Sequence, residues 1–198
     1  MIFQIGAVVI LLLFYGCYFG KMLCQRKKGI QTDQMGKGKT GTALWIERAL
    51  KAASVCVPVA EVICISRDQP GLPPGARITG LLLAALGTAV FYLSVITMRD
   101  NWRAGVSKEE TELVVDGIYR ISRNPAFLGF NLVYVGILLM FFSWVLFALS
   151  FLAAVLLHLQ IVKVEEPFLE EAFGEEYTRY RKKVKRYLGR NCKHFGNN

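Results

Sequence analysis

The sequence predicts an all-α fold, an integral membrane helical bundle of about five transmembrane helices. Three observations indicate this. The chain has 198 residues, of which 54% are hydrophobic and only 20% are charged. Its apolar residues stand in long uncharged blocks and are not dispersed with the period of an amphipathic helix or strand. Each block has about the 20 residues that a helix needs to cross the hydrocarbon core, and the alternating ten-residue pattern of a membrane barrel is missing.

The first expected span runs from Ile2 to Met22 and is followed by several cations. A secretory signal carries its positive charge before the apolar stretch and a small-residue cleavage site after it, so we interpret this segment as a retained span. The second span, Ala43 to Ile65, contains Glu47 and Glu61. Charged residues at membrane depth face protein or water and not lipid. A turn rich in proline and glycine then leads to a third, uncharged span from Ile78 to Met98.

The longest uncharged run, Ala126 to Val162, is too long for one span and slightly short for two separate spans. We therefore expect a tight C-terminal helical hairpin that turns near Phe142, Ser143 and Trp144. Its second helix continues beyond the membrane past Lys163 as an amphipathic helix with a basic outer face, which rests on anionic lipid headgroups. No nucleic-acid-binding motif is seen, and we predict no nucleic-acid partner.

The cations are concentrated in residues 21–51, in residues 99–123 and after Lys163. By the positive-inside rule these segments share the cytoplasmic side, which places the N-terminus outside and the C-terminus in the cytoplasm. We expect residues 1–76 to form an N-terminal membrane anchor of two spans with a basic linker. Residues 77–198 then form a membrane core of three spans with the C-terminal amphipathic helix.

Two further features are weak indicators of function. The Gly/Lys-rich segment 36–41 lacks the lysine position of a phosphate-binding loop, so we interpret it as a flexible basic linker that meets anionic lipid. The five cysteines are scattered without metal-ligand or C-x-x-C spacing. We interpret them as small hydrophobic residues and free thiols, and we predict no metal site.

Three polar patches on the expected cytoplasmic side combine charged, polar and aromatic residues. The first begins with Asn101-Trp102 and continues from Thr111 to Tyr119, with Gly117 at a turn. The second, Arg123 to Gly129, opens the hairpin and places a proline at the first helical position, where its missing N–H costs nothing. In the third, Glu165 is followed at four-residue intervals by Leu169 and Phe173, so a carboxylate and an aromatic stripe share one helix face.

In this order the patches resemble the isoprenylcysteine carboxyl methyltransferase family, which belongs with the phospholipid methyltransferases among integral membrane enzymes. The match rests on Asn-Trp, Leu-Val-x-x-Gly-x-Tyr, Arg-x-Pro-x-x-x-Gly and Glu-Glu-x-x-Leu-x-x-x-Phe-Gly-x-x-Tyr-x-x-Tyr. It covers about residues 99 to 188. The resemblance implies S-adenosylmethionine as the cofactor, and it implies that residues 77–198 are the catalytic core, with the active site in the cytoplasm. It also implies a lipophilic or prenylated acceptor, a carboxylate or an amine, that enters between helices from the membrane lipid.

The resemblance also implies which residues bind the cofactor. These are Thr111, Glu112, Leu113, Val114, Tyr119, Asn124, Pro125, Ala126, Phe127 and Glu165. Because methyl transfer is an in-line displacement, the protein mainly has to align the reactants and exclude water. A carboxylate acceptor needs a cation to orient it, and Arg123 is the candidate, with an arginine that snorkels to the interface as the alternative. Glu165 could equally pair with Lys163 on the helix surface.

The chain also departs from the family pattern. The family commonly has Arg-His-Pro-x-Tyr where this chain has Asn124 and Phe127, and near relatives place an arginine at the position of Ile161. These changes argue against a prenylcysteine carboxylate as the acceptor. His158 lies two helical turns before Glu165, so we expect it above the transfer site, where it could remove the proton of an amine acceptor. The alternative is a histidine that is hydrogen-bonded between helices.

Two alternatives from other classes remain open. A membrane reductase of the steroid-reductase type has a similar C-terminal topology and uses a reduced nicotinamide cofactor. A non-catalytic membrane protein could retain the fold and serve as an assembly partner. The sequence specifies neither the acceptor nor the oligomeric state.

Overall fold

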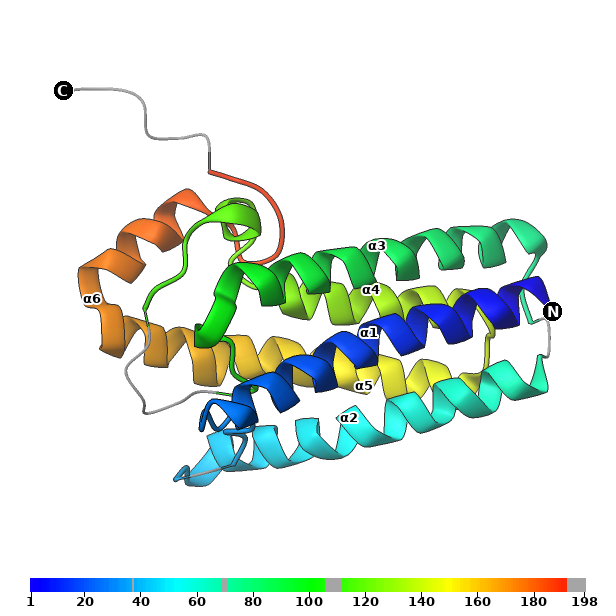
Figure 1. Cartoon of the computed structure of the whole chain (residues 1–198), viewed down its shortest axis with the longest axis horizontal. Helices are drawn as coiled ribbons and strands as arrows, with labels where there is room; N and C mark the ends of the chain where they lie inside the picture. The colour runs from blue at the N-terminus through cyan, green and yellow to red at the C-terminus, as the bar shows by residue number, and fades with distance from the viewer. Residues whose placement is uncertain (37, 69–70, 106–111, 192–198) are drawn as a thin grey trace.

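The computed structural model describes residues 1–36, 38–68, 71–105 and 112–191. In this part of the chain, five helices run side by side along the molecule and a sixth covers one end (Figure 1). They are α1 (Ile2–Lys27), α2 (Gly41–Arg67), α3 (Pro74–Met98), α4 (Pro125–Met140), α5 (Trp144–Gln160) and α6 (Glu166–Lys183). A π-helical turn, Ile161–Glu165, joins α5 to α6. The described residues form isolated β-bridges but no strand, so the predicted all-α fold is confirmed.

The helices form a multi-pass membrane bundle. Among the described residues, four helices are long and apolar enough to span a membrane, namely α1, α2, α3 with its extension to Asn101, and the continuous helix Trp144–Lys183. Helix α4 is apolar but has 16 residues, about 24 Å at 1.5 Å per residue. Many large apolar side chains on the outer faces of the bundle are exposed, as expected for a surface that contacts lipid. The predicted hairpin is confirmed, because α4 ends at Met140 and α5 begins at Trp144.

Helices α3 and α4 pack with their backbones in close contact. A Cβ atom on Gly136 would lie 2.6 Å from the carbonyl oxygen of Gly80, and one on Gly87 would lie 2.8 Å from the carbonyl oxygen of Gly129. Small residues let membrane helices approach closely where lipid supplies no hydrophobic driving force between them. The contact holds the end of α3 and the start of α4 together at one end of the bundle (Figure 1).

The segment between α1 and α2, expected to be a flexible linker, is folded against the bundle. The backbone N–H of Gly36 donates to Glu47 Oε2 at 2.5 Å, and Lys39 forms an ion pair with the same carboxylate. The backbone N–H of Gln34 donates to the carbonyl oxygen of Ala104 at 2.9 Å. The expectation was wrong because Glu47 is fully buried and its carboxylate requires hydrogen-bond donors, which this segment supplies.

The two ends of the bundle differ in character. The N-terminus lies at one end, and α6 lies at the other together with the segments that join α1 to α2 and α3 to α4 (Figure 1). The expectation that Glu47 and Glu61 face protein in the second span is confirmed, since both are fully buried. The polar patches of the sequence gather at the α6 end, where the candidate site lies.

Candidate functional site

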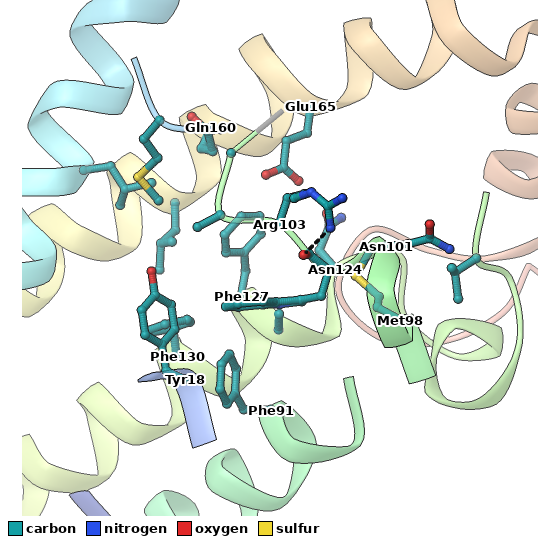
Figure 2. Close-up of a pocket in the computed structure, with 18 of the residues that line it drawn as sticks. Tyr18, Phe91, Met98, Asn101, Arg103, Asn124, Phe127, Phe130, Gln160 and Glu165 are labelled. Atoms are coloured by element: carbon teal, nitrogen blue, oxygen red, sulfur yellow. Dashed lines mark hydrogen bonds between the residues drawn. The ribbon is translucent and has the colours of Figure 1, made fainter. Parts of the chain in front are cut away.

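A cavity of about 420 Å³ lies at the α6 end of the bundle. This volume is in the range of small-molecule binding sites. All six helices contribute residues to its walls, as do the segments between α1 and α2 and between α3 and α4. Glu165, Gln160, Arg103 and Asn124 gather on one side, whereas aromatic rings such as those of Phe91 and Phe130 form the other (Figure 2). The cavity thus has a polar side and an apolar side.

Three polar patches that are far apart in the sequence meet in this cavity. It is lined by Glu112, Leu113, Val114, Tyr119, Arg123, Asn124, Ala126, Phe127 and Glu165. Pro125 occupies the first turn of α4, as expected, and does not line the cavity. Thr111 lies outside the described residues. The fold therefore brings together most of the site residues that the sequence suggested.

Tyr119, at the end of the first patch, connects α3 to α6. The turn before it requires Gly117, whose φ of 55° is in the left-handed region that glycine adopts without strain. The Tyr119 hydroxyl is 2.8 Å from Ser94 Oγ, and its carbonyl oxygen accepts a hydrogen bond from the Tyr180 hydroxyl at 2.7 Å. Burial raises the pKa of Tyr119, so its phenol stays protonated. The predicted turn at Gly117 is confirmed.

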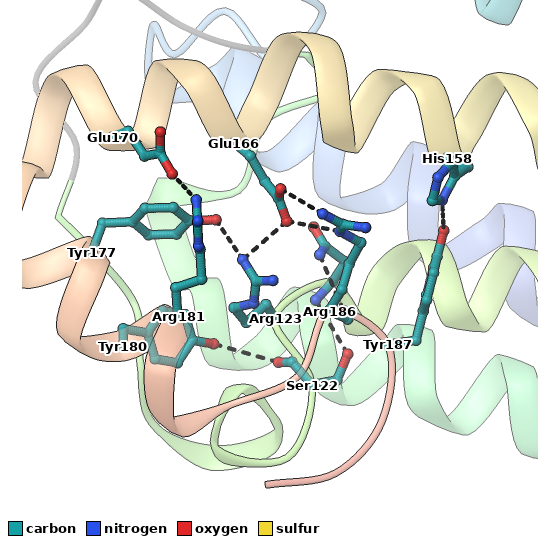
Figure 3. A network of polar contacts seen from close by, with 11 residues as sticks. Ser122, Arg123, His158, Glu166, Glu170, Tyr177, Tyr180, Arg181, Arg186 and Tyr187 are labelled. Atoms are coloured by element: carbon teal, nitrogen blue, oxygen red, sulfur yellow. Dashed lines mark hydrogen bonds and ion pairs between the residues drawn. The ribbon is translucent and has the colours of Figure 1, made fainter. Parts of the chain in front are cut away.

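An ionic cluster of Arg123, Glu166, Tyr177 and Arg186 lies next to the cavity (Figure 3). Arg186 donates from Nε and Nη2 to the two Glu166 oxygens, both at 2.8 Å, and Arg123 Nη1 lies 2.9 Å from Glu166 Oε1. Arg123 Nη1 also donates to the Tyr177 hydroxyl at 2.8 Å. The Arg123 side chain is 8% exposed, which does not fit a snorkelling arginine. Its Nε is buried without a hydrogen-bond partner among the described residues.

Residues 184–191, the C-terminal segment, turn back from α6 over the second patch. The backbone N–H of Gly189 donates to the carbonyl oxygen of Ile121 at 2.7 Å. Asn124 Nδ2 donates to the carbonyl oxygen of Arg186 at 3.1 Å. Asn124, which stands where the family commonly has histidine, therefore lines the cavity and also holds the C-terminal segment in place.

His158 does not lie at the cavity. Its Nδ1 is 2.7 Å from the Tyr187 hydroxyl of the C-terminal segment (Figure 3). A regular α-helix would place His158 and Glu165 on one face, but Ile161–Glu165 is a π-helical turn. Such a turn inserts one residue and rotates the residues after it by roughly 100°. The expected position of His158 above the transfer site is therefore wrong.

Sequence reasoning missed Gln160. Its side chain is 1% exposed, and it lines the cavity near Glu165 (Figure 2). A single amide within an otherwise apolar span was the available signal, because polar groups at membrane depth are costly. Glu165 itself is half-buried at the cavity, whereas Lys163 is exposed. The alternative of a surface pair between Glu165 and Lys163 does not fit this arrangement.

The aromatic stripe of α6 forms one wall of the cavity. The wall consists of Phe168, Leu169, Phe173, Tyr177 and Tyr180. Gly174, with φ 48° and ψ −117°, bends the helix in the middle of this stripe. Tyr177 and Tyr180 also pack against Val184, so the stripe both lines the cavity and anchors the C-terminal segment.

The apolar side of the cavity extends to the outer surface of the bundle. Tyr15 and Phe130 lie among its inner lining residues. Phe19 of α1 and Val55 of α2 also line it, although they are 50% and 62% exposed. The cavity therefore reaches the apolar outer surface at α1 and α2.

Comparison with known proteins adds independent information. The model of the phospholipid methyltransferase family matches residues 76–176, about half of the chain. Two curated proteins from Oryza sativa subsp. indica and subsp. japonica, each named "Probable protein-S-isoprenylcysteine O-methyltransferase", are 29% identical to this chain over 112 residues. These matches cover 53% of this chain and 56% of each relative. The chain thus spans about half the length of the curated relatives it matches.

Proposed function

Because this chain belongs to the phospholipid methyltransferase family, we propose that it transfers a methyl group from S-adenosylmethionine to a lipid-like or isoprenoid acceptor. The observation that carries the proposal is the cavity at the α6 end, which has one polar and one apolar side. A water-soluble cationic donor and a membrane-soluble acceptor need such a space in order to meet. We further propose that the α6 end faces the cytoplasm, where the cofactor is available.

The residues of the polar side fit this cofactor. Glu165 offers a negative charge toward its cationic groups, and the buried, unpartnered Nε of Arg123 offers a donor toward its carboxylate. When bound, S-adenosylmethionine supplies a methyl group that is activated by a positively charged sulfur. We propose that it is held by the residues that the family resemblance assigned. These are Thr111, Glu112, Leu113, Val114, Tyr119, Asn124, Pro125, Ala126, Phe127 and Glu165.

In this proposal the protein aligns the reactants and keeps water away from them. The C-terminal segment covers the second patch, and its contact with Asn124 and the ionic pairing of Arg186 with Glu166 hold it there. Arg123 lies where it can orient an anionic group of the acceptor or the cofactor. Residues 77–198 supply most of these groups, and residues 1–76 complete the cavity wall.

The acceptor that fits the apolar side is lipophilic. Aromatic rings of Phe91 and Phe130 line its interior, and Phe19 and Val55 connect it to the lipid-facing surface. Two acceptors are candidates. An isoprenylcysteine carboxylate is consistent with the name of the two Oryza sativa relatives, and a phospholipid amine is consistent with the phospholipid methyltransferase family.

We expect Glu165→Gln to weaken the binding of S-adenosylmethionine about tenfold, because a hydrogen bond or contact to a charged group is lost. Calorimetric titration of the detergent-solubilised protein measures this affinity. Glu171→Gln, which changes an exposed carboxylate on α6, is the control and should leave the affinity unchanged. Equal affinities of the two variants would contradict the assignment of Glu165 to the cofactor site. Titration with NADPH tests the reductase alternative, which requires tight binding of that cofactor.

The acceptor is identified by incubating membrane lipid extracts with the protein and isotopically labelled S-adenosylmethionine, followed by mass spectrometry. A labelled product that mild base hydrolyses is a methyl ester, which indicates a carboxylate acceptor. A label that survives base indicates an amine. If the protein binds S-adenosylmethionine but labels no lipid or prenylated compound, the non-catalytic alternative is favoured.

A further inference from the structure

We infer that Glu47 and Gln160 are positioning residues that set the placement of the Glu165 carboxylate toward the positively charged end of the donor. The inference rests on the proposed function. It assigns a role in donor recognition to Gly36, Lys39 and Glu47, which lie outside the part of the chain that matches the family.

Gln160 lies beside two acidic groups, the fully buried Glu47 and the half-buried Glu165. Its Nε2 donates to Glu47 Oε1 at 3.1 Å. Gln160 and Glu165 lie together on the polar wall of the cavity (Figure 2). An amide NH₂ group has two hydrogens, so it can serve one carboxylate with each of them.

The orientation of the Gln160 amide leaves its oxygen without a hydrogen bond, and this observation supports the inference. Gln160 Oε1 is buried and has no hydrogen-bond partner among the described residues. A buried polar atom without a partner is rare in native structures and requires an explanation. Ionised carboxylates only accept hydrogen bonds, so both acidic groups favour the NH₂ group facing them and leave the oxygen unpaired. The structure thus leaves the amide oxygen unpaired and keeps the NH₂ group on Glu47, with its second hydrogen available to the neighbouring Glu165.

Glu47 is itself held in place from several directions. It is fully buried, accepts the backbone N–H of Gly36 at 2.5 Å, and pairs with Lys39. Because these partners come from the segment between α1 and α2, the carboxylate cannot turn away from Gln160 without losing them. The chain of contacts therefore runs from this segment, through α2 and the end of α5, to the cavity.

A correctly placed Glu165 carboxylate should distinguish the cationic donor from its product. S-adenosylmethionine carries a positive sulfonium, whereas S-adenosylhomocysteine has a neutral thioether and is otherwise the same molecule. A negative charge aimed at the sulfur strengthens binding of the first more than binding of the second. The ratio of the two affinities therefore reports the placement of Glu165, and general loosening of the fold would not change it selectively.

The test measures both affinities by calorimetry for the wild-type protein, Gln160→Met, Glu47→Gln, Glu165→Gln and the double variant Gln160→Met with Glu165→Gln. We expect Gln160→Met to lower the affinity for S-adenosylmethionine about tenfold and that for S-adenosylhomocysteine much less. Glu47→Gln keeps the shape of the side chain but removes its charge, so it should give a smaller effect in the same direction. In the Glu165→Gln background, Gln160→Met should not change the ratio further, because both substitutions then act on one interaction.

Gln4→Met is the matched control. Gln4 donates a hydrogen bond to the carbonyl oxygen of Ile65 and does not line the cavity, so its replacement should leave the ratio unchanged. An unchanged ratio in Gln160→Met, or additive effects in the double variant, would overturn the inference and leave the proposed function in place. A wild-type protein that binds neither compound would instead overturn the proposed function and this inference with it.

Discussion

Replacing Glu166 with alanine should destabilise the protein by about 3 kcal/mol and abolish tight binding of S-adenosylmethionine, because removal of one partner of a buried ion pair leaves the other charge uncompensated. The Glu166 carboxylate pairs with both Arg123 and Arg186, and only 8% of the Arg123 side chain is exposed. Arg186 is 33% exposed, so water screens part of its charge. The expected destabilisation therefore lies at the lower end of the range for broken buried ion pairs. Loss of the Arg186 contact should also release the C-terminal segment from the rim of the cavity.

Thermal unfolding in detergent, proteolysis of the C-terminal segment and calorimetric titration of the cofactor measure these effects. Glu170→Ala is a close control on the same helix. Its ion pair with Arg181 is about half exposed, and exposed pairs contribute at most about 1 kcal/mol. If the two variants unfolded at the same temperature and bound the cofactor equally well, the cluster around Glu166 would have no special role in closing the site.

Replacing Gly136 with leucine should prevent α3 and α4 from packing. A Cβ atom at this position would lie 2.6 Å from Ala84 N and from the carbonyl oxygen of Gly80. These are backbone atoms, so the clash cannot be relieved by a side-chain rotation and the helices must separate. We expect the free energy of unfolding to fall by more than about 3 kcal/mol, which is the upper end of the usual cost of overpacking. Because α3 carries Ser94, which contacts Tyr119, and α4 follows the second patch, cofactor binding should be lost as well.

Size-exclusion chromatography and thermal unfolding in detergent report this effect. Gly16→Leu makes the same change in a membrane helix at a position where no atom lies within 4 Å of the added Cβ, so it should be tolerated. A monodisperse Gly136→Leu protein that is as stable as Gly16→Leu would show that the close approach of α3 and α4 is not required.

These predictions follow from contacts between distant segments. Glu166, Arg123 and Arg186 are brought together only after α6 and the C-terminal segment fold back over the start of α4. The same holds for Glu47 and Gln160, which are separated by 113 positions. In both cases a charged or polar group in an apolar setting was visible in the sequence, but its partner was not.

The apolar blocks alone determined the all-α membrane fold, since a helix is the structure that satisfies its own backbone hydrogen bonds in lipid and the block lengths match the membrane. The order of the polar motifs was sufficient to indicate the family. The hairpin at Phe142 and the turn at Gly117 also followed from local chemistry.

Tertiary structure decided what local patterns cannot specify. A π-helical turn moved His158 away from the expected site, and burial of Glu47 brought Gly36 and Lys39 of a supposed linker into contact with the bundle. Helical periodicity assumes a constant rotation per residue, so one inserted residue changes which side chains share a face. A buried carboxylate selects its donors by proximity in space, and that proximity is fixed only when the helices pack.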